Sequence, residues 1–216
     1  MKSQLHIFGK IVKKYNIDLD LINDLNVKYE DHKNKLGSFG HRLAGRIKSE
    51  LEFTTLMQDT KIFKTISNCI EDYINDFNKF EVEMYSPVKS SNDFKDNKSI
   101  TITSCWINDM KAGEYNPPHT HWNLSGWSTV LFLKVPQFLN DNDPNTPHKF
   151  RDGNLGFITE HETKYYTPIV GDFFIFSASH QHVVLPFKTK TPDEIRRSMS
   201  FNFLYKEDIE NNYANK

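Results

Sequence analysis

Cysteine is scarce in this chain, neither sign of charge is in excess, and long apolar runs are missing. Only Cys69 and Cys105 occur among 216 residues, which argues against a disulfide-stapled scaffold and favours two buried thiols in a reducing compartment. The 27 basic and 28 acidic residues give a net charge of −1, so the composition supports no binding to nucleic acid or to an anionic membrane. No run approaches the roughly 18 apolar residues of a membrane span, and residues 1–10 lack the apolar core of a signal peptide.

Apolar and aromatic residues are plentiful. Hydrophobic residues make up 38% of the chain and aromatic residues 13%, with 17 Phe against nine Gly, which is enough to build a sizeable core. A length of 216 residues favours one domain over residues 1–216. We therefore expect a soluble, cytoplasmic, globular protein.

The apolar period changes near residue 95 and divides the chain into two parts. Apolar residues at i, i+3 and i+4 predict an amphipathic helix from about 60 to 79. Residues 19–29 loosely suggest another helix, and residues 40–56 are compatible with either a short helix or a loop. The polar residues 86–98 are typical of a connector. Residues 1–95 are therefore interpreted as a helical support region.

Strand patterns dominate residues 96–206. Residues 100–107 alternate apolar and polar side chains, and β-branched or aromatic residues are concentrated at 127–135, 172–177 and 198–205. Several short strands after a helical prelude favour a mainly β fold, an antiparallel sandwich or barrel covered on one side by the N-terminal helices. Residues 140–148 are expected to form a loop at its rim, and residues 207–216 a tail.

Two histidines one residue apart, His119 and His121, are followed about sixty residues later by His182. The pair alone is a weak motif, because nine His in 216 residues give roughly 0.4 such pairs by chance, and His180 forms a second one with His182. The preceding Pro117-Pro118 favours extended backbone, in which residues i and i+2 face the same side. Three imidazoles would suit iron, zinc, copper or nickel and leave positions open for a substrate.

Arg196 opens a strand in which Arg196, Ser198 and Ser200 share one face. Arg197, Met199 and Phe201 share the other face. An arginine inside a barrel is costly unless it meets an anion, and its planar guanidinium suits a carboxylate, with the Ser198 hydroxyl as a further donor. An edge strand with its polar face in water is the alternative interpretation.

Three function classes fit these residues. One is a metalloenzyme that binds an anionic ligand beside the arginine. The second is a cupin-like, histidine-rich metalloenzyme, a dioxygenase or an isomerase that uses no such anion, which leaves the arginine unexplained. The third is a non-catalytic jelly-roll binding module, in which the histidines would be dispersed in space.

Eight short motifs follow one another over residues 101–204: Trp106-Ile-Asn, Gly113, Pro118-His-Thr-His, Leu124-Ser-Gly, Gly153-Asn-Leu-Gly-Phe, Gly171-Asp-Phe-Phe-Ile-Phe-Ser, His182-Val-Val-Leu-Pro and Arg196-Arg-Ser-Met-Ser-Phe-Asn. Taken together and in this order, they resemble the 2-oxoglutarate- and iron(II)-dependent oxygenases. The resemblance is greatest to the branch of such oxygenases found in bacterial and marine bacteriophage genomes.

The resemblance implies a double-stranded β-helix, or jelly roll, with His119 and His182 as iron ligands and Arg196 binding the distal carboxylate of 2-oxoglutarate. His121 occupies the position that is an acid in the common His-x-Asp/Glu motif, so it is the expected third ligand, with water, Glu114, Asp172 or His180 as alternatives. A neutral imidazole there leaves the iron site one unit more positive.

Asn108 and Ser198 are expected beside Arg196 in the cosubstrate site. Trp106, Trp122, Asn123 and Trp127 are candidates for a substrate pocket, although packing in the core is the commoner role of tryptophan. The implied reaction is hydroxylation of a C–H bond in a peptide side chain or small metabolite, with Fe(II), 2-oxoglutarate and O₂ consumed to succinate and CO₂. If the chain is phage-encoded, the host cytoplasm would be its location. The prime substrate and the oligomeric state are not readable from the sequence.

Overall fold

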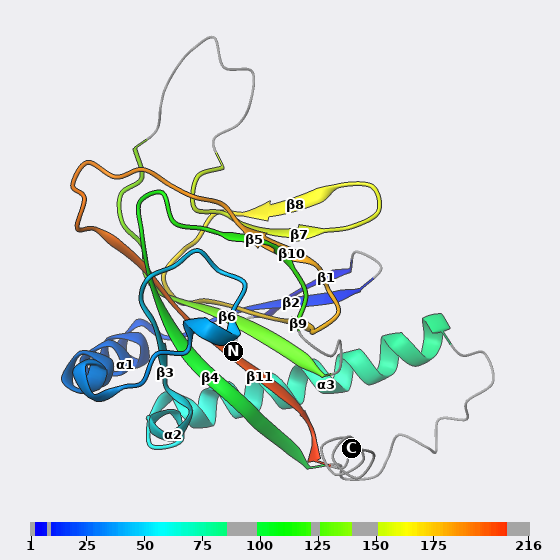
Figure 1. Ribbon diagram of the computed structural model, residues 1–216. Coiled ribbons are helices and arrows are strands. Elements are labelled where there is room, and N and C mark those ends of the chain that lie inside the picture. Colours follow the sequence, from blue (N-terminus) through cyan, green and yellow to red (C-terminus); the bar gives the residue numbers. More distant parts are fainter. Residues whose placement is uncertain (1–2, 8–9, 86–98, 122–125, 140–150, 207–216) are drawn as a thin grey trace.

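The chain folds into two antiparallel sheets with helices on one side, as a computed structural model shows (Figure 1). The structure describes residues 3–7, 10–85, 99–121, 126–139 and 151–206. The predicted connector at 86–98, the rim loop at 140–148 and the tail at 207–216 therefore lie outside the described residues. No helix in the described ranges is both long enough and apolar enough to cross a membrane.

The large sheet has seven strands in the order β1-β2-β9-β6-β11-β4-β3. Its long central strand β11 pairs antiparallel with β4 and with β6, so the second half of the chain forms the middle of the sheet. In chain order the seven strands are β1 (Ser3–Ile7), β2 (Ile11–Asn16), β3 (Glu50–Glu52), β4 (Ile100–Lys111), β6 (Trp127–Lys134), β9 (Asp172–Ser177) and β11 (Ile195–Tyr205).

The small sheet has four short strands in the order β5-β10-β7-β8. Its strands are β5 (Asn116–His119), β7 (Leu155–Ile158), β8 (Thr163–Tyr166) and β10 (His182–Val184). Figure 1 shows this sheet on the opposite side of the large sheet from α3, and the two sheets form the sandwich that the sequence predicts.

Helices cover the other face of the large sheet. They are α1 (Leu19–His32), α2 (Thr54–Met57) and α3 (Ile62–Tyr85), with the 3₁₀ turn η1 (Lys33–Lys35) directly after α1. A second 3₁₀ turn, η2 (Gly40–Arg42), ends at Arg42, which lines the cavity between the sheets. The helix predicted from about 60 to 79 corresponds to α3, and the looser prediction at 19–29 corresponds to α1. The ambiguous residues 40–56 contain η2, β3 and α2.

The first 95 residues are not purely helical, because β1, β2 and β3 add strands to the large sheet. The sequence Ile-Val-Lys-Lys-Tyr-Asn of β2 hides this, since Lys13 interrupts the alternation of apolar and polar residues. Lys13 is nonetheless 4% exposed, and its ammonium group pairs with Asp72 and Asp76 of α3. The ion pairs allow a charged side chain to sit in a buried strand.

Alternation along the central strands creates two cores. Side chains that face the helices form one cluster, including Phe173, Ile175, Met199 and Phe201, with Ile66 and Tyr73 of α3 among their neighbours. Phe132, Phe174 and Phe176, each next in sequence to a residue of the first cluster, point the opposite way and join Phe157 of the small sheet in a second cluster between the sheets. Since every second residue of a strand changes face, the same strands that anchor the helices also supply the wall of the space between the sheets.

Candidate metal centre

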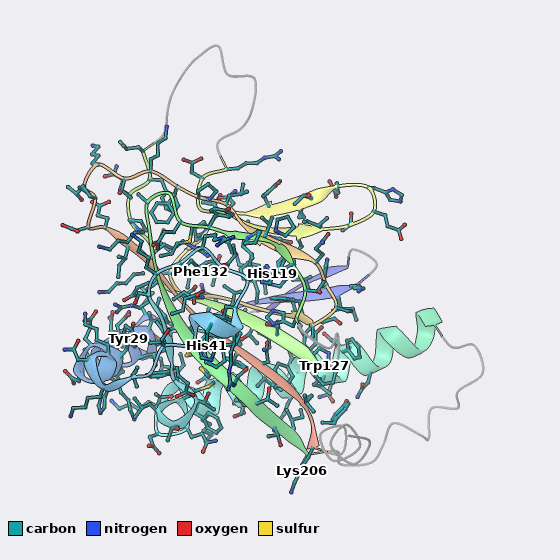
Figure 2. All side chains as sticks on the ribbon, viewed as in Figure 1. Tyr29, His41, His119, Trp127, Phe132 and Lys206 are labelled. Carbon is teal, nitrogen blue, oxygen red and sulfur yellow. The ribbon has the colours of Figure 1, made fainter. Side chains whose placement is uncertain are left out.

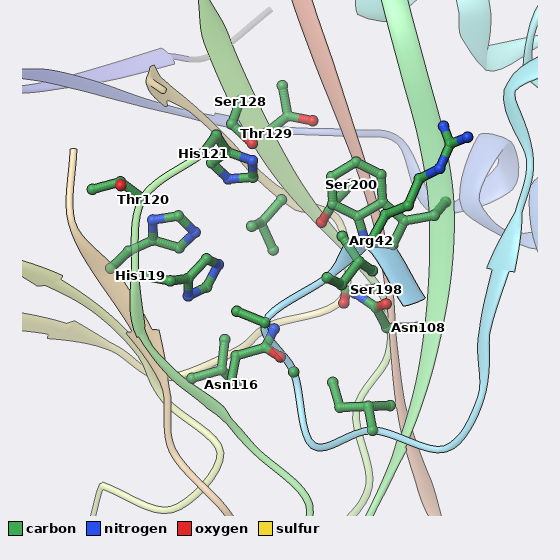
Figure 3. Close-up of a pocket in the computed structure, with 18 of the residues that line it drawn as sticks. Arg42, Asn108, Asn116, His119, Thr120, His121, Ser128, Thr129, Ser198 and Ser200 are labelled. Atoms are coloured by element: carbon green, nitrogen blue, oxygen red, sulfur yellow. The ribbon is translucent and has the colours of Figure 1, made fainter. Parts of the chain in front are cut away.

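His119, His121 and His182 meet between the two sheets, although about sixty residues separate His182 from the other two in sequence. β5 and β10 pair antiparallel with His119 directly opposite His182. The backbone N–H of His121, two residues beyond His119, donates to the carbonyl of Ala178 at 2.9 Å, which fixes the segment after β5 against the turn that precedes β10. Figure 3 shows the imidazoles of His119 and His121 on the same side of the pocket.

The three imidazoles are close enough to share one ion. One nitrogen from each ring lies within 4.8 Å of the others. Ring centroids are separated by 4.2 Å for His119 and His182, 5.2 Å for His121 and His182, and 5.8 Å for His119 and His121. The dispersed histidines expected of a non-catalytic jelly roll are not what the structure shows.

Hydrogen bonds fix which nitrogen faces the shared space. The Nδ1 atoms of His119 and His182 lie 2.7 Å from the carbonyl of Pro117 and 3.0 Å from that of His180. Because a carbonyl only accepts, each Nδ1 carries the proton and each Nε2 keeps its lone pair. Nε2 of His121 is buried without a hydrogen-bond partner in the described part of the chain. His119 and His182 are therefore oriented by backbone carbonyls so that Nε2 can bind a metal, and Nε2 of His121 is also available for this.

Burial keeps these histidines neutral. It lowers the pKa of His119, and it lowers the pKa of His121 to about 4 with a smaller contribution from His119. The pKa of His182, which is 4% exposed, falls well below its usual value, mainly through burial. Neutral imidazole is the form that binds a metal, so the protein supplies the ligands ready for use near neutral pH.

None of the alternative ligands joins this cluster. The carboxylate of Glu114 accepts from the backbone N–H groups of Lys48 and Lys111, and that of Asp172 pairs with Lys14 at 2.8 Å. The His180 ring packs against Phe157 with centroids 5.2 Å apart and does not line the pocket. The described residues therefore offer three imidazoles and no carboxylate at this position.

Arg196 lies in the same pocket and is buried without an acidic partner among the described residues. Its side chain is 2% exposed, its Nε has no hydrogen-bond partner among the described residues, and Nη1 contacts only the Met110 sulfur at 3.1 Å. The guanidinium lies over the Phe132 ring at 4.8 Å. Burial lowers the pKa of Arg196 to about 9. An unpaired buried cation of this kind is stabilised when an anion binds beside it.

Arg197, the next residue, shows the opposite arrangement on the helix-facing side. Its guanidinium donates to both carboxylate oxygens of Asp109 at 2.5 and 2.8 Å, and to Glu30 at 2.8 Å. It also lies over the Tyr29 ring at 4.4 Å. These partners raise the pKa of Arg197 above its usual value despite burial. The chain thus pairs one arginine fully and leaves the adjacent one free for a ligand.

The remaining predicted pocket residues divide into three groups. Asn108, Ser198 and Trp106 line the cavity of about 180 Å³ that contains the three histidines and Arg196. Trp127 does not, because its side chain faces the helices and packs against Phe77 and Phe203 with centroids 5.3 Å away in both cases (Figure 2). The substrate-pocket prediction for Trp127 is therefore wrong, and packing explains it. Trp122 and Asn123 lie outside the described residues.

Residues 42–47, called the cover loop here, form a wall that the sequence did not reveal. Arg42, Leu43, Ala44, Gly45 and Ile47 line the cavity opposite the strands. A Cβ on Gly45 would lie 2.1 Å from Oδ1 of Asn116, so any larger residue would require the Asn116 side chain or the loop to move. The one signal in the sequence was the run of small residues Ala44-Gly45 inside a segment without periodicity.

The two packed sheets, with histidines and an arginine between them, define a double-stranded β-helix protein with a metal-binding pocket. Residues 104–202 match the family described as "Putative 2OG-Fe(II) oxygenase". The matched residues include most of β4, the three histidines and Arg196 on β11. The resemblance stated from the motifs is confirmed, although its bacteriophage branch is untested.

Solved structures show the same fold. A prolyl-4-hydroxylase from Pseudomonas putida has a TM-score of 0.52 and 13% identity, with 90% of this chain and 92% of that chain covered. A Trichoplax adhaerens prolyl hydroxylase, solved with a hypoxia inducible factor peptide fragment, has a TM-score of 0.56 and 15% identity, with 91% and 84% covered. No curated protein sequence matches significantly.

The residues present fit the groups that the family implies. Three neutral imidazoles with nitrogens within 4.8 Å suit an iron(II) ion, and the buried guanidinium of Arg196 without an acidic partner suits a carboxylate of 2-oxoglutarate. Both features lie in one cavity.

Proposed function

We propose that this protein is an iron(II)- and 2-oxoglutarate-dependent dioxygenase that hydroxylates a C–H bond. The observation that carries the proposal is the placement of Arg196, buried and without an acidic partner among the described residues, in the same cavity as three neutral histidines. The family match supports the class of reaction. A histidine-rich metalloenzyme without 2-oxoglutarate leaves this arginine unexplained.

His119, His121 and His182 would hold the iron through their Nε2 atoms. When bound, iron(II) together with 2-oxoglutarate and O₂ supplies the oxidising power, and the cosubstrate is converted to succinate and CO₂ while one oxygen atom enters the substrate. The chain's own contribution is to hold and orient the reactants and to exclude water.

Arg196 would bind the distal carboxylate of 2-oxoglutarate. Its planar guanidinium can donate two parallel hydrogen bonds to a carboxylate, in surroundings where Phe132 and Met110 exclude water. Ser198 follows on the same face of β11, and Asn108 lies beside it because the two residues pair in register between β11 and β4. Both side chains can therefore add hydrogen bonds to the same ligand.

The test is formation of succinate. The purified, metal-free protein is supplied with iron(II), 2-oxoglutarate and O₂, and succinate is measured by nuclear magnetic resonance. We expect slow succinate formation even without prime substrate, and its loss in Arg196→Met. Arg46→Gln, a change of an exposed arginine that does not line the cavity, is the matched control and should keep the rate. Succinate no higher than in the metal-free sample would contradict the proposal.

A further inference from the structure

The described residues that line the cavity carry positive charge and no negative charge. Arg42 and Arg196 are the permanent cations, and no Asp or Glu stands among the described lining residues. The common iron site of this chemistry has two histidines and a carboxylate, whereas this one presents three neutral imidazoles. The site therefore lacks the negative charge that the protein itself normally supplies.

A count of charges shows what a bound substrate would have to balance. Iron(II) and the two guanidinium groups would bring four positive charges into or beside the cavity, and the dianion of 2-oxoglutarate neutralises two of them. The excess that remains is of one sign, in a site partly shielded from water, where unbalanced charge is costly. A second anion would relieve it.

Arg42 stands where a second anion would enter. It is exposed and lines the cavity, so it lies at the mouth, and Figure 3 shows its side chain on the other side of the pocket from His119 and His121. Its guanidinium lies over the Phe39 ring at 5.6 Å. Phe39 in turn stacks on Trp106 with centroids 5.3 Å apart and planes inclined by 15°, and Trp106 lies 6.3 Å from the His121 ring.

The stacked rings of Phe39 and Trp106 restrict the position of the Arg42 guanidinium, and its N–H groups do not have to form hydrogen bonds for this. Phe39 and Trp106 are both buried, at 8% and 4% exposed, so they provide a fixed surface under Arg42. Stacking on a ring face leaves the N–H groups at the edge of the guanidinium available. Arg42 forms no ion pair with an acidic residue in the described part of the chain. Glu50, which is 2% exposed and lies under the same loop, has one carboxylate oxygen without a hydrogen-bond partner in the described part of the chain.

We propose that the prime substrate is a small molecule bearing a carboxylate, which Arg42 binds at the mouth of the cavity while Arg196 holds 2-oxoglutarate inside. This inference rests on the proposed function. A carboxylate is favoured because the edge of a planar guanidinium matches its two oxygens. A small molecule is favoured because the cavity of about 180 Å³ must also hold the metal and 2-oxoglutarate, which leaves little enclosed space for the substrate.

The test measures binding directly and needs no turnover. The full chain is loaded with manganese(II), which broadens the proton resonances of any small molecule held near it, and 2-oxoglutarate is kept saturating. The probes are acid and amide pairs of matched shape in which the amide carries no other carboxylate: propionate with propionamide, butyrate with butyramide, and 3-phenylpropionate with its amide. Ethyl phosphate, which has no carboxylate, is included to distinguish a phosphate from a carboxylate.

We expect at least one acid to bind about tenfold more tightly than its amide, the order of magnitude for a partly exposed, charge-assisted contact. Arg42→Gln should remove this preference and Arg42→Lys should keep part of it. Arg46→Gln should leave it unchanged, since Arg46 is exposed in the same loop but does not line the cavity.

Four results would overturn the inference. They are no binding of any acid while 2-oxoglutarate is broadened, equal binding of acids and amides, a preference that survives in Arg42→Gln, and binding of the phosphate probe alone. Broadening of 2-oxoglutarate in the unaltered protein is recorded first. If 2-oxoglutarate itself does not bind near the metal, the proposed function fails, which is a different outcome from failure of Arg42 as the substrate-binding residue.

Discussion

The adjacent residues Arg196 and Arg197 should respond to the same substitution with opposite changes in stability. In the protein without ligands, Arg196→Met removes a buried cation that has no acidic partner among the described residues and replaces it with an apolar side chain of similar length. Arg197→Met instead leaves Asp109 and Glu30 without their shared partner. We therefore expect the first variant to be more stable than the unaltered protein and the second to be less stable.

The magnitude follows from the surroundings of each guanidinium. Burial lowers the pKa of Arg196 from 12.5 to about 9, which at about 1.4 kcal/mol per pKa unit is a penalty of up to about 5 kcal/mol on the charged side chain. Contacts with Phe132 and Met110 offset part of it, so we expect Arg196→Met to raise the free energy of unfolding by about 2 kcal/mol. Breaking the buried ion pair in Arg197→Met should lower it by about 3 kcal/mol.

Urea unfolding of the metal-free protein at pH 7.5, followed by circular dichroism, measures both changes. Calorimetry with the metal-loaded variants completes the experiment, because Arg196→Met should lose 2-oxoglutarate binding although it gains stability. If Arg196→Met is destabilised as much as Arg197→Met, then Arg196 stabilises the fold through contacts within the protein. That result would refute the claim that Arg196 is left unpaired in order to bind a ligand.

Three further predictions concern other parts of the chain. Trp127→Ala should lower the free energy of unfolding by about 4 kcal/mol while 2-oxoglutarate binding in calorimetry is kept, because Trp127 packs on the helix side of the sheet. Glu50→Gln should remove a pH dependence of stability, because burial and then Glu114 raise the pKa of Glu50 from 4.5 to about 7. The protonated Glu50 carboxyl makes its full contribution to the free energy of unfolding below about pH 4.5. This contribution, up to about 3 kcal/mol, is lost as the pH rises through 7. His121→Asp should keep one metal ion per chain by elemental analysis, whereas His121→Ala should weaken binding.

Each of these predictions has a clear opposing result. Lost cosubstrate binding in a folded Trp127→Ala protein would place Trp127 in the site after all. Identical urea midpoints for Glu50→Gln and the unaltered protein from pH 4 to 8 would show that the carboxyl is not buried as described. Full metal occupancy in His121→Ala would remove His121 from the ligand set.

The central strands and the faces of β11 could be predicted because each depends on a short-range pattern. Alternation along residues 196–201 separates the polar face with Arg196 and Ser198 from the apolar face with Met199 and Phe201, and the structure places them on those two sides. The family motifs added the order in which the histidines and the arginine occur. Together they were sufficient to predict that these residues share one pocket.

Other parts of the fold depend on contacts between distant segments, which no local pattern reveals. β2 was missed because Lys13 is made acceptable in a buried strand only by Asp72 and Asp76 of α3. The cover loop was missed because its position depends on the close approach of Gly45 to Asn116. The prediction for Trp127 was wrong because its sequence neighbour Ser128 lines the cavity, whereas the Trp127 side chain lies on the face of β6 that packs against the helices.

The central claim is that the three histidines and Arg196 act together as a metal and 2-oxoglutarate site. It is tested most directly by titrating 2-oxoglutarate into the protein by calorimetry, with manganese(II) and without it. We predict one 2-oxoglutarate per chain with the metal, and little or no binding without it, in His182→Ala or in Arg196→Met. Absence of binding by the metal-loaded protein, or binding that needs neither the metal nor Arg196, would contradict the account.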